Sequence, residues 1–230
     1  MNELITGLLQ ESISGIALGC IYALIALGFT LIYKASEVVN FAQGEVMMVG
    51  AYVNFFFVSY FSSMVGEVNG WVFLLAFLGS IIFAVIFGIT LDFIINRPLK
   101  DEPVFSIIMA TISLAIILRA LTALIAGPIS LVPQSPFGGS VMEVGGVVVS
   151  YLDLSIIFSA VVLMGLFFVF FNKTRWGIAM KATSEDSEAA QLMGIPVKKV
   201  YMIVWVFASI VGVVSGILLA PRMSLLDTSM

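Results

Sequence analysis

The feature that most constrains this chain is a series of long apolar stretches with almost no charge. A helix needs roughly 20 apolar residues to cross the hydrocarbon core of a membrane. Six stretches reach or approach this length: residues 13–33, 46–66, 68–91, 103–118, 154–172 and 200–221. The fourth runs into Arg119 and continues apolar to residue 126. We therefore expect an all-α fold, a polytopic transmembrane helical bundle with at least six spans.

Two shorter segments are long enough to add broken or re-entrant helices. They are residues 36–44 and the Val-rich residues 144–151. Non-helical backbone at membrane depth must be buried in protein or line a cavity. We expect all of residues 1–230 to form one transmembrane domain, with a cytoplasmic loop at residues 173–199.

Composition excludes several other classes of protein. Hydrophobic residues make up 61% of the chain and charged residues 10%, far from the balance of a soluble domain. The chain has no His and one Cys, which disfavours most metal sites and most Ser/His or Cys/His catalysis. A net charge of −4 offers no basic surface to nucleic acid. Hydrolytic or redox chemistry is therefore not expected.

The basic residues predict an orientation, because cytoplasmic loops are enriched in Lys and Arg. Residues 62–70 and 127–150 contain neither. The basic residues near span ends fall on one side if the N-terminus is outside: Lys34, Arg97, Lys100, Lys173, Arg175, Lys181, Lys198 and Lys199. Arg222 is the exception. The chain is thus expected to have its N-terminus outside.

Small residues recur every four positions on two spans. The stripes are Gly15, Gly19 and Ala23 on the first span, and Ala208, Gly212, Gly216 and Ala220 on the last. Small residues let membrane helices approach closely and gain dispersion contacts. We expect packing within this chain, and the alternative is an interface with another subunit.

A polar segment joins the first two spans. Asn40, Gln43 and Glu45 lie around Gly44, at the edge of an apolar stretch. Polar groups there commonly face a bundle interior or a pathway, and discontinuous helices can hold a polar solute. The alternative is that Asn40 and Gln43 cap helix ends, while Glu45 is a first-turn carboxylate facing the helix dipole.

The loop at residues 173–199 is the longest polar stretch, and residues 182–194 within it predict a short helix. Thr183 or Ser184 can cap its start, and Gly194 followed by Pro196 can end it. Three acidic residues lie in or near the first turn: Glu185, Asp186 and Glu188. Helical spacing makes one apolar face of Ala189, Leu192 and Met193. Membrane surfaces favour basic helices, so this acidic helix is expected to dock on a protein partner.

Two charged residues lie inside or near spans. Asp92 is about one turn from the inner end of the third span. Arg119 lies about 24 Å along the fourth span, at 1.5 Å per residue, which places it near the outer interface. We therefore do not expect the two residues to pair. We expect Arg119 to extend to the outer headgroups, and a substrate-facing role is the alternative.

Several of these segments resemble the permease subunits of branched-chain amino-acid ABC importers. The likeness covers essentially all of residues 13–220. It includes residues 19–33 and 39–45, where the family usually has His in place of Gln43. It continues in the polar loop and the last span, at Trp176, Gly177, Glu185, Asp186, Ala190, Leu192, Gly194, Ile195, Gly212, Gly216 and Leu218. Glu188, Ala189, Ala190 and Gly194 also fit the looser pattern of ABC permeases in general.

The resemblance implies one half of the membrane channel of an ATP-driven importer in a bacterial or archaeal inner membrane. The implied partners are a second permease, two ATP-binding subunits and an extracytoplasmic substrate-binding protein, besides membrane lipid. The chain would bind no cofactor, because ATP and Mg²⁺ belong to the ATPases, and it would catalyse nothing itself. The implied coupling residues are Glu185, Asp186, Glu188, Ala189, Ala190, Leu192, Met193 and Gly194.

The implied substrates are branched-chain amino acids, with Asn40, Gln43 and Glu45 lining the pathway. Family members are usually some tens of residues longer, so a C-terminal region is expected to be missing here. Relatives that carry urea, short amides or other amino acids provide an alternative. An ion-coupled secondary transporter predicts more charge at mid-span, and an assembly subunit would not need the acidic helix.

Overall fold

The computed structural model describes residues 2–36, 38–66, 69–99, 102–127, 131–133, 141–144 and 147–223. The helices are α1 (Asn2–Ser36), α2 (Gln43–Val65), α3 (Gly70–Leu91), the π-helix η1 (Asp92–Asn96), α4 (Arg97–Leu99), α5 (Val104–Ala126), α6 (Tyr151–Lys173), α7 (Arg175–Glu185), α8 (Ser187–Leu192) and α9 (Val197–Met223). The strands are β1 (Val141–Val144) and β2 (Val147–Ser150).

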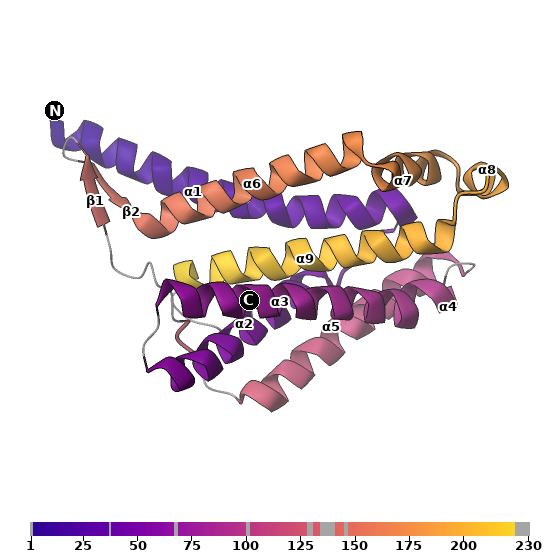
Figure 1. Cartoon of the computed structure of the whole chain (residues 1–230), viewed down its shortest axis with the longest axis horizontal. Helices are drawn as coiled ribbons and strands as arrows, with labels where there is room; N and C mark the ends of the chain where they lie inside the picture. The colour runs from indigo at the N-terminus through magenta and orange to yellow at the C-terminus, as the bar shows by residue number, and fades with distance from the viewer. Residues whose placement is uncertain are drawn as a thin grey trace.

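The helical membrane bundle predicted from the apolar stretches is confirmed. Within the described ranges, six helices are long and apolar enough to cross a membrane. They are α1, α2, α3 extended by η1 and α4, α5, α6 and α9. The long helices lie roughly side by side along the length of the molecule, and α7 and α8 project at one end (Figure 1).

Helix α9 is the centre of the bundle. It packs against α1, α2 and α3, while α6 covers α1 and α5 covers α2 (Figure 1). The small-residue stripe of α9 makes this possible, because a Cβ at Gly216 would overlap the Met47 carbonyl oxygen of α2. The same two helices also meet at a glycine of α2, because a Cβ at Gly50 would lie 2.6 Å from Val213 Cα of α9. The expectation of packing within the chain is thus confirmed for the last span.

The stripe on α1 behaves differently. Gly15, Gly19 and Ala23 are exposed, and a Cβ at either glycine would meet nothing within 4 Å. The buried side of α1 is instead formed by Ala17, Ile21 and Leu24. Internal packing was the wrong expectation for the first stripe, because α1 turns its other face toward α6 and α9.

Residues 144–151 were long enough for a short re-entrant or broken helix, but they do not form one. Val147–Ser150 form strand β2, which pairs antiparallel with β1 so that Val141 lies opposite Ser150. Ser150 then caps α6 by accepting a hydrogen bond from the Leu152 backbone N–H. A Val-rich run suits a pleated strand as well as a buried helix, so the apolar pattern alone did not separate them. Residues 145 and 146 lie outside the described residues.

Candidate functional site

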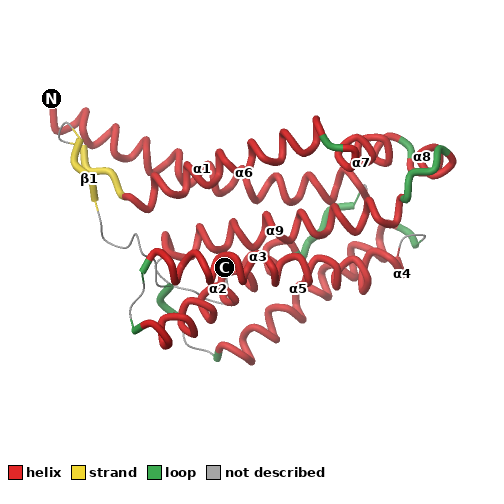
Figure 2. Tube along the Cα trace, viewed as in Figure 1, coloured by secondary structure: helices red, strands yellow, loops and turns green. Residues whose placement is uncertain are grey.

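The chain between α1 and α2 turns back into the bundle before α2 begins. Residues 38–42 are non-helical, and Val38, Asn40 and Ala42 are buried. Asn40 stabilises the turn, since its Oδ1 accepts a hydrogen bond from the Ala42 backbone N–H at 3.0 Å. The loop lies inside the length of the bundle rather than beyond its end (Figure 2). The expected broken segment at residues 36–44 is therefore confirmed, and Glu37 lies outside the described residues.

Gln43, the first residue of α2, fills a slot between two other helices. Its Nε2 donates to the Ala208 carbonyl oxygen of α9 at 3.1 Å. A Cβ at Gly28 of α1 would lie 2.6 Å from this nitrogen, and one at Gly212 would lie 2.9 Å from it. Ala208 is eleven residues into α9, about 16 Å from the first residue of that helix, Val197. Gln43 is therefore a mid-bundle residue and not a helix cap.

Glu45 lies in the first turn of α2, as its alternative interpretation predicted. There it accepts a hydrogen bond and forms an ion pair with Arg119 of α5, with a distance of 2.6 Å from Nη2 to Oε1. Glu45 is nearly buried, while the Arg119 side chain is 55% exposed. The pairing of Arg119 with Glu45 was not predicted when Arg119 was expected to extend to the outer headgroups. The sequence did not show this pair because α2 begins deep in the bundle, at the level of Arg119.

Asn40 also has an unused donor. Its residue exposure is 1%, yet Nδ2 has no hydrogen-bond partner among the described residues. A cavity of about 20 Å³ lies against it, with Asn96 and Thr111 also in its lining. A space of this size can hold one water molecule. The unpaired amide makes Asn40 the polar group in this region that is best placed to bind a small polar molecule.

Asp92 is satisfied within its own segment. Its Oδ1 accepts from Asn96 Nδ2 at 2.8 Å, and its Oδ2 accepts from Arg97 Nε at 3.0 Å. These spacings of four and five residues fit the π-helix η1, which brings Arg97 back over the carboxylate. As expected, Asp92 and Arg119 are not partners.

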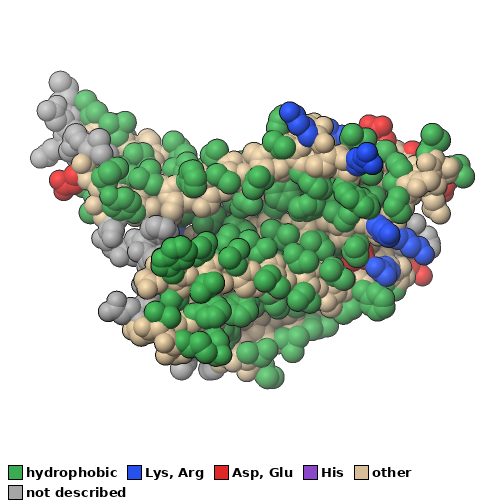
Figure 3. Space-filling model, viewed as in Figure 1, with side chains coloured by type: hydrophobic (Ala, Val, Ile, Leu, Met, Phe, Trp, Pro, Cys, Tyr) green, Lys and Arg blue, Asp and Glu red, His purple; other side chains and the backbone are tan. Residues whose placement is uncertain are grey.

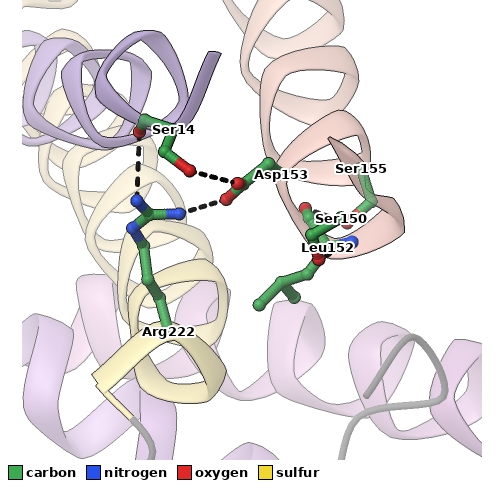
Figure 4. Close-up of polar contacts among 6 residues, drawn as sticks. All are labelled: Ser14, Ser150, Leu152, Asp153, Ser155 and Arg222. Atoms are coloured by element: carbon green, nitrogen blue, oxygen red, sulfur yellow. Dashed lines mark hydrogen bonds and ion pairs between the residues drawn. The ribbon is translucent and has the colours of Figure 1, made fainter. Parts of the chain in front are cut away.

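A third ion pair joins three helices at the end of the bundle opposite α7 and α8 (Figure 1). Arg222, in the last turn of α9, pairs with Asp153, in the first turn of α6 (Figure 4). Ser14 of α1 joins them, donating from Oγ to Asp153 Oδ2 at 2.8 Å and accepting from Arg222 Nη2 through its carbonyl oxygen at 3.1 Å. Arg222 therefore neutralises a nearly buried carboxylate. In the sequence, Arg222 was the one residue that did not fit the expected distribution of basic residues. This misfit was the signal that it has a carboxylate partner.

Residues 175–192 form two helices and not the single helix predicted over residues 182–194. Helix α7 continues to Glu185, with Thr183 buried inside it. Asp186 then breaks the helix and caps α8, because its Oδ1 accepts from the Glu188 and Ala189 backbone N–H groups. Thr183 and Ser184 are therefore not the caps. The predicted end is confirmed, since Gly194 has φ +85°, which favours glycine, and Pro196 follows.

The apolar face predicted within residues 182–194 is present and exposed. Leu192 is 89% exposed and Met193 is 84% exposed, at the tip of the molecule. Ala189 is exposed beside them, whereas Ala190 is buried toward the bundle. Glu185, Asp186 and Glu188 are exposed, so an acidic rim accompanies these apolar side chains. The Lys and Arg side chains that are visible on this face gather at the same end of the molecule (Figure 3).

Together these features define a multi-pass membrane protein whose interior holds polar and charged groups at span depth, a property typical of transport proteins. Residues 12–229 match the family model described as branched-chain amino acid transport system / permease component. The chain belongs to this family.

Individual relatives agree with the family match. The high-affinity branched-chain amino acid transport system permease protein LivH of Escherichia coli (strain K12) is 30% identical over 95% of this chain and 72% of its own length. The permease protein BraD of Pseudomonas aeruginosa is 29% identical over 95% of this chain and 73% of its own. A probable LivH of Methanocaldococcus jannaschii is 28% identical over 85% of this chain and 61% of its own. No solved structure matches the chain significantly.

Proposed function

We propose that this chain forms one half of the translocation pathway of an ATP-driven importer for branched-chain amino acids. The observation that carries the proposal is the family match across residues 12–229, which includes both the buried polar segment and the projecting tip. The relatives LivH and BraD are named as permeases of branched-chain amino acid transport systems. A second permease, two ATP-binding subunits and an extracytoplasmic binding protein would complete the importer.

ATP hydrolysis would belong to the partner subunits, with α8 as their docking element. Leu192 and Met193 form an exposed apolar knob, which is costly in water and suits a groove on a protein. The Asp186 cap and the Gly194 turn fix the knob on a short helix that connects, through α7 and α9, to the bundle. Movement of an ATPase could in this way be passed to the membrane helices.

The test of docking is purification from the source membrane in mild detergent with mass identification of bound proteins. The wild type is expected to retain two ATPases and a second permease. Leu192→Asp is expected to lose the ATPases and keep the permease pair. Val104→Asp is the matched control, because Val104 is also exposed at a helix end, in the first turn of α5 where a carboxylate is tolerated. Recovery of the chain alone in every case would refute the importer.

The proposed pathway contains Asn40, Gln43 and Glu45. A substrate zwitterion needs an acceptor for its ammonium and donors for its carboxylate. Glu45 and Arg119 supply opposite charges 2.6 Å apart, and the free Nδ2 of Asn40 supplies a further donor. Glu45→Gln is expected to reduce leucine uptake by proteoliposomes containing the complete importer at least tenfold. Unchanged uptake would remove Glu45 from the pathway, and preferential uptake of urea or short amides would replace the substrate class.

We further propose that the N-terminus lies outside the cytoplasm. The described basic residues at the α7–α8 end support this orientation, because the two remaining arginines, Arg119 and Arg222, are paired with carboxylates. In a Cys20→Ser background, Trp71→Cys is expected to react with an impermeant maleimide on intact cells. Met193→Cys is expected to react only after permeabilisation. The reverse pattern would invert the topology.

A further inference from the structure

A large groove opens where α1, α6 and α7 meet near the cytoplasmic end, apart from the polar segment around Gln43. Its volume is about 450 Å³, which is within the range of ligand pockets. Leu27 and Leu31 form one wall, α6 contributes the facing wall, and Val204 of α9 lies at its floor. The lining from α6 is Met164, Phe167, Phe168, Phe171 and Asn172.

The polar groups of the groove gather at one end. Lys34 lies in the last turn of α1, and Lys181 and Ser184 come from α7. Leu27 and Lys34 are seven residues apart on one helix, so the apolar part extends about 10 Å into the bundle from the charged end. The groove therefore has a charged mouth at headgroup level and an apolar interior at acyl-chain level.

The described side chains at this mouth give it a positive charge. Lys181 Nζ donates to the neutral Asn172 Oδ1 at 2.8 Å, which leaves its other two N–H groups available. In the described part of the chain, no carboxylate lies within ion-pair distance of Lys34 or Lys181. Two exposed ammonium groups above an apolar groove match a phosphate with an attached hydrocarbon chain.

We propose that this groove binds an anionic phospholipid of the inner leaflet, with its phosphate at Lys34 and Lys181 and an acyl chain against Phe168 and Leu31. A free phosphate could not contact the apolar walls. A zwitterionic lipid has no net negative charge, so it would be attracted less strongly by the two lysines. Because Met180 and Lys181 belong to α7, the bound lipid bridges the cytoplasmic segment to α1 and α6. Lipid composition is then expected to affect the part of the chain that carries α8.

The test is titration of the delipidated, detergent-purified protein with phosphatidylglycerol or with phosphatidylcholine of the same acyl chains, followed by native mass spectrometry. Phosphatidylglycerol is expected to bind at least tenfold more tightly. Each lysine near an anionic lipid contributes about 1 kcal/mol, so Lys34→Gln/Lys181→Gln is expected to weaken this binding about 30-fold. Lys198→Gln/Lys199→Gln is the matched control, because both lysines are exposed at the same end but do not line the groove. It is expected to change binding less than twofold.

Further arms keep the proposal open to refutation. Lys34→Arg/Lys181→Arg keeps the charge and is expected to retain binding, which excludes a folding defect as the cause of loss. Thr30→Phe fills the groove from its α1 side and is expected to weaken binding with both lysines present. Equal affinity for the two lipids, equal loss in the control, unchanged binding in Thr30→Phe, or equal competition by glycerol phosphate would each overturn the proposal.

Discussion

Helices α1 and α9 carry the same pattern of small residues every four positions, yet they use it in opposite ways. The stripe of α9 lies against other helices, with Gly212 beside Gln43 and Gly216 against Met47. The N-terminal part of the α1 stripe, Gly15 and Gly19, faces away from the rest of the described chain. The pattern shows that a helix can be approached closely, and does not show from which molecule the neighbour comes.

The largest effect is expected from filling the α9 stripe. Gly216→Leu places a side chain where the Met47 backbone lies, and backbone cannot move aside as a flexible side chain can. We expect a loss of more than about 3 kcal/mol in the free energy of unfolding. SDS titration in mixed micelles, followed by Trp fluorescence, measures it. Gly165→Leu on α6 is the control, since nothing lies within 4 Å of its Cβ, and equal losses in both variants would refute the close packing.

The next effect concerns the ion pair between Arg222 and Asp153, which together with Ser14 joins α1, α6 and α9. Arg222→Met leaves Asp153 nearly buried without its cation, and a loss of about 3 kcal/mol is expected. Asp153→Asn removes the charge that needs neutralising. The double variant is therefore expected to be more stable than Arg222→Met alone in the same titration. A double variant that is less stable than both single variants would show that the ion pair is not the relevant interaction.

Gly28 sharpens the comparison, because it lies on α1 but is enclosed like the glycines of α9. Its Cβ would lie 2.6 Å from Gln43 Nε2, so Gly28→Ala displaces that amide from the Ala208 carbonyl. We expect a loss of about 1–2 kcal/mol. The loss should fall below about 0.5 kcal/mol in a Gln43→Ala background, where the amide is absent. Additive losses would mean that Gly28 and Gln43 do not interact.

Much of the fold was predictable because each span is a local property of the sequence. Length and the absence of charge suffice to identify a membrane helix, and Gly194 with Pro196 suffices to end α8. Which face of each helix packs against the other helices was not predictable. It depends on where distant segments meet, as with Gly15 on one face of α1 and Leu24 on the other.

The residues of the candidate site were predicted from the sequence, but their positions in the bundle were not. Asn40, Gln43 and Glu45 were identified as polar groups beside a span, but they were placed at its edge. The buried turn at residues 38–42 carries them toward mid-bundle, and only this displacement brings Glu45 to Arg119. Asp186 was similarly identified as an acidic first-turn residue, whereas its φ of −156° makes it the cap between α7 and α8.

The smallest effect is expected on the outward face of α1. Gly19→Ala adds a methyl group where nothing lies within 4 Å, so stability is expected to change by less than about 0.5 kcal/mol. SDS titration of the isolated chain measures this value beside Gly28→Ala, which makes the same chemical change nine residues along the same helix. If Gly19→Ala cost as much as Gly28→Ala, both faces of α1 would be packed in the isolated chain. A neutral Gly19→Ala that weakened recovery of a second permease would instead assign the outward stripe to the interface between subunits, which was the alternative that the α1 pattern left open.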